Sequence, residues 1–131
     1  MADEVEIARR DAPTQYFTVA DGTAITKGTV MVLSGAMTAI AHSAANEVFL
    51  GIATEDKPAS DGRTVIGVMR KGIFRMKVTA AVGLGNTVNL GATANQVTQT
   101  ATTSQQNLSR IVGYALRAAT TAEDVIEIYV A

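Results

Sequence analysis

Apolar residues occur along this chain in short runs, separated by polar breaks that often contain glycine. The clearest run is residues 72–78, where every second side chain from Phe74 onward is large and apolar, while Arg75 and Lys77 lie between them. Because the side chains of a strand point alternately to its two faces, this pattern predicts a strand with one buried and one basic face. Residues 29–33 are continuously apolar, which predicts a strand covered on both faces.

No stretch of ten or more residues has the apolar spacing of a helix. Many short strands at regular spacing are typical of an all-β fold, here a small barrel or sandwich. We expect strands at residues 16–20, 29–33, 37–42, 47–54, 63–69, 72–78, 108–118 and 125–130. Residues 55–62 are the clearest loop, because they are polar, contain a proline and end in Asp-Gly.

One long segment is unusually polar. Residues 91–107 carry no charge and consist mainly of Thr, Gln, Ala and Asn, with Val97 as the only larger apolar residue. This composition predicts a strand with a long polar loop, or a flexible tip, and in either case a segment too polar to fill a core.

The chain contains what reads as a repeated pattern. Gly28 and Gly85 each precede an apolar run, and Gly51 and Gly113 each lie inside one. The second glycine of each pair follows the first by 57 and 62 residues, a drift that one longer loop would produce. Two interpretations are open: two related β-units, the second beginning near residue 79, or chance recurrence in a glycine-rich chain. In either case the glycines inside the runs suit close backbone packing or a bulge.

The N-terminal stretch differs from the rest of the chain. Residues 1–15 are rich in charge, lack a sustained apolar stripe and contain Pro13, which would end a helix early. We expect an extended N-terminal arm over residues 1–15 and a single β-domain over residues 16–131. The arm would be ordered only against another surface, or it is a terminus that contacts nothing.

Composition narrows the classes of function. The 131 residues suit one domain, and a 5% aromatic content suits a core of small and β-branched side chains. A net charge of −1 does not suggest a nucleic-acid partner, and the absence of cysteine excludes disulfides and thiolate metal sites. No apolar run is long enough to span a bilayer and the N-terminus is acidic, so we expect no membrane partner and synthesis in the cytoplasm.

Candidate chemistry is sparse. His42 is the only histidine, and without a nucleophile motif around it we expect a surface or loop-edge residue. Glu55, Asp56 and Asp61 resemble a carboxylate pair or a weak divalent-metal site, but basic neighbours make solvated loop charges the better interpretation. We therefore predict that the protein is not an enzyme and uses no cofactor or metal.

Nucleotide binding has no support either. Lys27 precedes Gly28, the reverse of the phosphate-loop order, and Gly83-Leu-Gly85 is too short for a dinucleotide fingerprint. The one concentration of basic residues lacks interleaved stacking aromatics, so it predicts a strand face paired with an acidic protein surface. Its members are Arg63, Arg70, Lys71, Arg75 and Lys77.

The order of the glycine-containing motifs is informative as a series. In chain order they are residues 22–32, which begin Gly-x-Ala-Ile-x-x-Gly, then Gly-Ile-Ala at 51–53, Val-Met-Arg-Lys-Gly at 68–72, Gly-x-x-Val-x-Leu at 85–90 and Val-Gly-Tyr-Ala-Leu at 112–116. This series resembles the capsid decoration, or cement, proteins of tailed bacteriophages, and the likeness covers most of residues 16–131.

The resemblance implies a β-rich structural protein on the outer surface of a virus capsid. Such a protein would stabilise the capsid by bridging subunits of the major capsid protein, and it would associate with itself, commonly as a homotrimer. Binding many identical sites would give the charged arm a role, since an arm can order on a neighbour. The expected capsid contacts are Glu4, Glu6, Ile7, Arg9, Arg10, Asp11 and Tyr16.

A second hypothesis belongs to another class of function. The uncharged residues 93–107 could form the recognition loop of a carbohydrate- or host-surface-binding β-module displayed on the virion. A glycan-binding assay discriminates between the two hypotheses, because a capsid cement needs no carbohydrate ligand.

Overall fold

The computed structural model describes residues 4–10, 14–45, 47–100 and 111–130, and all of its regular elements are strands, as predicted. The strands in chain order are β1 (Glu6–Arg10), β2 (Gln15–Thr18), β3 (Val30–Gly35), β4 (Thr38–Ala41), β5 (Val48–Ala53), β6 (Val65–Met69), β7 (Gly72–Val78), β8 (Thr87–Leu90), β9 (Gln96–Gln99), β10 (Ile111–Ala115) and β11 (Val125–Val130). No described residue lies in a helix that could cross a membrane.

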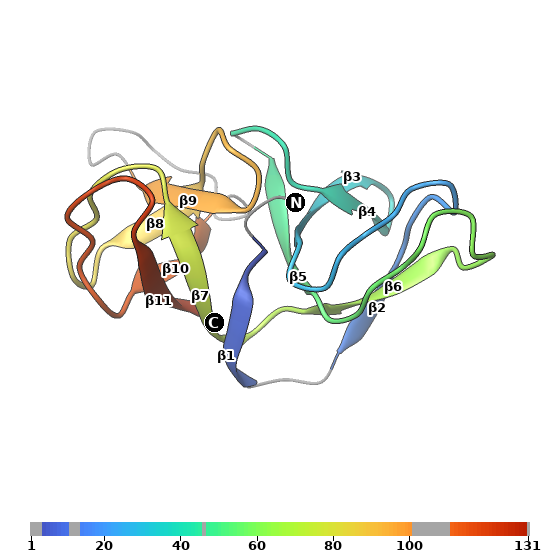
Figure 1. The fold of residues 1–131 in the computed structure, drawn as a ribbon, viewed down its shortest axis with the longest axis horizontal. Helices are drawn as coiled ribbons and strands as arrows, with labels where there is room; N and C mark the ends of the chain where they lie inside the picture. The colour runs from blue at the N-terminus through green and yellow to red at the C-terminus, as the bar shows by residue number, and fades with distance from the viewer. Residues whose placement is uncertain (1–3, 11–13, 46, 101–110, 131) are drawn as a thin grey trace.

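The strands form two closed barrels of five strands each. The first barrel has the order β2-β4-β3-β5-β6, and the second has the order β7-β11-β10-β8-β9, closed by pairing of β7 with β9. Strand β1 belongs to neither ring and adds to β7 from outside. Figure 1 shows the barrels side by side, with β1 between them.

Both barrels have the same topology. In each, the first strand runs parallel to the third and antiparallel to the fifth, and the second pairs with the third and the fourth. This identity of strand order and direction confirms the two related β-units. The second unit begins at β7, so the predicted start near residue 79 was one strand too late.

The paired glycines occupy matching places in the two barrels. Gly28 and Gly85 both have positive φ, at 91° and 77°, just before the second strand of each barrel. Gly51 and Gly113 lie in the fourth strands, where a Cβ would overlap a backbone carbonyl oxygen of the fifth strand. The register also shifts beside each of these two glycines. Close backbone packing at a bulge therefore accounts for both, as predicted.

The hydrophobic core has two parts. Inward-facing residues of the first barrel, among them Phe17 and Ile66, make one cluster inside that barrel. A second, larger cluster fills the other barrel and continues between the barrels, where it includes Val30 and Val32 of β3. The first half of β3, Val30–Val32, is thus buried on both faces, as the apolar run predicts, whereas Leu33 at the end of that run is exposed. The larger cluster is shared by the two barrels.

A buried polar network joins the barrels. His42 follows β4, and its Nε2 lies 2.9 Å from the carbonyl oxygen of Gly91. Its Nδ1 accepts a hydrogen bond of 3.0 Å from the Asn95 N–H. The Asn95 Oδ1 in turn accepts from the Val30 N–H at 2.8 Å. Because Nδ1 is an acceptor, the ring hydrogen lies on Nε2 and is donated to Gly91.

Two predictions about polar residues were therefore wrong. His42 is buried rather than at a surface or loop edge, and its position between the barrels explains why. The polar segment also contributes to the interior, since Asn95 and Gln96 are buried. Their polar atoms are compatible with burial because they are hydrogen-bonded. Residues 101–107 of that segment lie outside the described residues.

Candidate functional site

The N-terminal strand β1 is held by its own chain. It pairs antiparallel with β7, with a register shift between Ile7 and Arg9. The buried residue before it, Val5, donates its N–H to the carbonyl oxygen of Gly28 at 2.6 Å, and Ile7 packs against the shared core. For residues 1–15 we expected either an arm ordered only against another surface or a terminus that contacts nothing. Strand β1, within that range, instead pairs with β7 of its own chain.

Strand β7 accommodates β1 because it is long. Its residues 72–75 face β1, while only Lys77 and Val78 pair with β9, and β11 covers the other edge of the strand. The predicted alternation is confirmed: Phe74 is buried in the core, and Arg75 is exposed on the opposite face. Strand β1 thus extends the barrel sheet at the point where β7 and β9 diverge.

A shallow, open groove of about 230 Å³ lies beside this pair of strands. Its lining residues are Glu4, Glu6, Arg75, Lys77 and Val125. Two carboxylates and two cations therefore face one small space. This alternation of charge favours a protein surface of mixed charge as the partner over a single small ion.

The groove residues also interact with one another. Arg75 forms ion pairs with Glu6 and, at 3.3 Å, with Glu127, and Arg117 approaches Glu127 at 2.7 Å. Hydrogen bonds from Arg117 chiefly, and from Arg75, lower the pKa of the Glu127 carboxyl. Because these side chains are largely solvent-exposed, the pairs orient the groove more than they stabilise the fold. The basic face of β7 does meet acidic groups, as predicted, but here they come from the same chain.

The structure separates the predicted contact residues into groups. Glu4, Glu6 and Ile7 lie together on or next to β1, whereas Tyr16 is exposed on β2 of the first barrel. Arg9 and Arg10 belong to β1 and pair through their backbones with Ile73 and Gly72 of β7. Asp11 lies outside the described residues.

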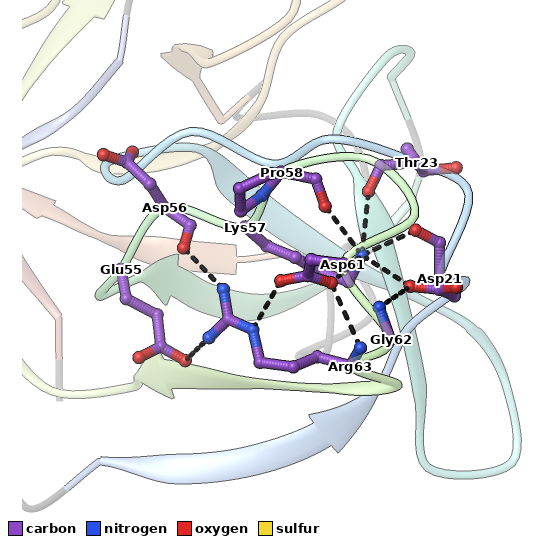
Figure 2. Close-up of polar contacts among 9 residues, drawn as sticks. All are labelled: Asp21, Thr23, Glu55, Asp56, Lys57, Pro58, Asp61, Gly62 and Arg63. Carbon is purple, nitrogen blue, oxygen red and sulfur yellow. Dashed lines mark hydrogen bonds and ion pairs between the residues drawn. The ribbon is translucent and has the colours of Figure 1, made fainter.

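A second cluster of charge occurs at the far end of the first barrel (Figure 2). Lys57 has a side chain with no exposed surface, and its ammonium group donates to the carbonyl oxygens of Asp21 at 2.7 Å and Pro58 at 3.2 Å. The Asp61 carboxylate lies 3.1 Å from the same ammonium group. Lys57 thereby ties the loop of residues 55–62 to the loop that follows β2.

The charges around Lys57 are paired rather than simply solvated. The Arg63 guanidinium donates to Asp61 at 2.7 Å and holds the pKa of that carboxyl well below its usual range, with a further contribution from Lys57. Arg63 also pairs with Glu55 at 3.3 Å, and Asp56 accepts a hydrogen bond from the backbone of Lys27. The prediction of solvated loop charges was therefore incomplete.

This cluster lacks the arrangement of a metal site. Within the part of the chain that the structure describes, no group of three or more His, Asp or Glu side chains is placed to hold a metal ion. The cations of Lys57 and Arg63 occupy the space between the carboxylates, as Figure 2 shows, so the cluster acts as a structural clasp. Sequence reasoning missed it because a lysine in a polar loop carries no signal of burial.

Comparison with known proteins supplies independent evidence. A family model described as phage cement protein matches residues 8–130, which include both barrels and the last three residues of β1. No curated protein matches the chain. The family match agrees with the resemblance carried by the ordered glycine motifs.

Proposed function

The chain belongs to the phage cement protein family, and we propose that it stabilises a phage capsid by bridging neighbouring subunits of the major capsid protein. Membership implies decoration of the capsid and a structural rather than catalytic role. The bridging, the surfaces that perform it and the oligomeric state are parts of the proposal. The family match over residues 8–130 is the observation that carries it.

The fold supports a bridging role through its stiffness. Two barrels that share a continuous core, joined by the His42–Asn95 network, resist bending better than two domains on a linker. A stiff body that contacts two capsid subunits transfers load between them, whereas a flexible one would not. Capsid contacts on the two barrels can therefore bridge two subunits only because the barrels are rigidly joined.

We place one capsid contact at the groove beside β1. Glu4, Glu6, Arg75 and Lys77 offer donors and acceptors of both signs, which suits a complementary polar surface. Arg9, Arg10, Asp11 and the preceding terminus would extend this contact along the shell. Assembly as a homotrimer would present three such surfaces at once, so that modest individual affinities give strong attachment.

The alternative, a carbohydrate- or host-surface-binding module, has less support. Its recognition loop was predicted over residues 93–107, and Asn95 and Gln96 within that range are buried and face protein partners. Two of its polar side chains are thus unavailable to a ligand. The hypothesis is tested by a glycan array, on which specific binding would favour it over the capsid role.

The proposed function is tested by adding the purified protein back to phage heads that lack it. We expect saturable binding at a fixed ratio to the major capsid protein, together with a higher temperature of genome release. A charge reversal at the groove, Lys77→Glu, should weaken binding, whereas Lys71→Glu, on the exposed β6–β7 connection, should not. Heads that bind none of the protein would refute the proposal.

A further inference from the structure

Strand β2 leaves part of its backbone unpaired. It pairs with β6 along its whole length, but with β4 only between Thr18 and Thr38. The Thr18 N–H donates to the carbonyl oxygen of Met37, on the β4 side, and the Val19 N–H donates to Thr64, on the β6 side. Because successive residues of a strand direct their backbone groups to opposite edges, those of Tyr16 point to the β4 side. No described residue pairs with Tyr16 there.

The equivalent position in the second barrel is occupied. Thr18 corresponds to Lys77, since each lies opposite the first residue of the fifth strand and each pairs with the third strand. Two residues earlier in each strand, Tyr16 therefore corresponds to Arg75. The edge of β7 at Arg75 is covered by β1, with Glu6 directly opposite. The repeated fold thus has two such edges, one with an added strand and one without.

The side chains around the open edge are apolar and exposed. Tyr16 is 62% exposed and Met37, on the β4 side, is 64% exposed, and both lie next to Thr18 on the outer face of the first barrel. In Figure 1 strands β2 and β6 lie on the side of this barrel away from the second one. A free strand edge with apolar flanks is a template for another strand.

The charge of the two edges identifies the kind of strand that each accepts. At the occupied edge, Glu6 of the added strand pairs with Arg75. At the open edge Tyr16 takes the place of Arg75. A carboxylate opposite Tyr16 in an added strand would therefore have no cation to pair with. The fitting strand is uncharged and apolar there. Among the described strands only β1 lies outside a closed barrel, and because it carries Glu6, none of the described strands of a second copy is suitable.

We propose that the edge of β2 at Tyr16 binds an extended, uncharged segment of the major capsid protein as an added strand. The segment hydrogen-bonds to the backbone of Tyr16, and its apolar side chains cover Tyr16 and Met37. Backbone pairing supplies affinity in this mode of recognition, and the flanking side chains supply specificity. This inference rests on the proposed function and adds a second contact on the barrel that the groove does not reach.

The test compares variants of this edge in binding to heads that lack the protein. Met37→Lys places a charge on the β4 side of β2, beside the added strand, and Tyr16→Pro removes the N–H that faces it. The matched control is Leu84→Lys, because Leu84 is 69% exposed in the loop before β8. We expect at least a roughly tenfold increase in Kd for both edge variants and none for the control. Thermal unfolding of each variant checks its fold, and Met37→Lys carries the test alone if Tyr16→Pro does not fold.

The outcomes separate this inference from the proposed function. If the wild-type protein fails to bind heads, the proposed function is wrong and this inference falls with it. If the wild type binds and folded Met37→Lys binds equally well, only the β2 contact is wrong. Hydrogen exchange gives a second readout, with protection of the Tyr16 amide expected on heads and not in the free protein. Protection in the free protein, abolished when Met37→Lys dissociates an oligomer, would assign the edge to a second copy and overturn the inference.

Discussion

Replacement of Lys57 by methionine tests whether the clasp in Figure 2 holds the end of the first barrel together. Methionine fills a similar volume but removes an ammonium group with two short hydrogen bonds to carbonyl oxygens and an ion pair to Asp61. Hydrogen bonds that involve a charged group contribute about 1.5–3 kcal/mol each, and breaking a buried ion pair costs about 3–5 kcal/mol.

The structure favours the lower end of that range. Asp61 keeps its pair with Arg63, and Asp21 is 41% exposed, so neither carboxylate becomes an uncompensated buried charge. We therefore expect Lys57→Met to lower the free energy of unfolding by about 3 kcal/mol. For a chain of 131 residues this corresponds to a decrease in Tm of about 10 °C.

The assay is urea unfolding followed by circular dichroism, with calorimetry for Tm. The matched control is Lys71→Met, because Lys71 is exposed in the connection between β6 and β7 and should change stability by less than about 0.5 kcal/mol. A Lys57→Met variant within about 1 kcal/mol of the wild type would refute the reasoning. That result would mean that desolvation of the ammonium group cancels its hydrogen bonds.

Three further predictions concern stability. His42→Ala should lower the free energy of unfolding by about 3 kcal/mol in urea, because it opens a cavity and leaves the Asn95 N–H unpaired; an effect below about 1 kcal/mol would contradict this. Gly113→Ala should prevent stable folding, since its Cβ would overlap a carbonyl oxygen, whereas Gly22→Ala should fold normally; a well-folded Gly113→Ala by calorimetry would argue against the packing. The pKa of the Asp61 carboxyl is lower in the folded protein than in the unfolded chain, so its ionised form stabilises the fold at any pH above the unfolded pKa. This stabilisation is lost as the pH falls through the lower pKa of the folded state. Asp61→Asn should therefore differ from the wild type at neutral pH and converge with it in strong acid, and a constant difference at all pH values would refute the assignment.

Local pattern was sufficient for most of the strands and for the repeat, although strands β1 and β8 were not expected. Alternation at residues 72–78, the continuous apolar run at β3 and the glycine pairs are properties of neighbouring residues and of spacing, so they are visible without a structure. The family match agrees with the order of those same motifs.

Contacts between residues far apart in the sequence could not be predicted from local pattern. The burial of Lys57 depends on carbonyl groups from another loop, and that of His42 depends on Asn95 from the other barrel. Neither residue has a neighbour in sequence that indicates burial. The open edge of β2 is also a property of topology, because it is defined by how far β4 accompanies β2 and by the presence of β1 on the related strand.

The proposed role of this chain is that of a structural component of the capsid exterior. Its most direct test is the composition of purified phage particles, measured by quantitative mass spectrometry against the major capsid protein. We expect the protein and the major capsid protein to occur in a fixed ratio, close to that of a lattice component. We also expect the protein to be accessible to added protease or antibody on intact heads. Purified particles that lack the protein, or contain it only in traces, would contradict its role as a capsid component.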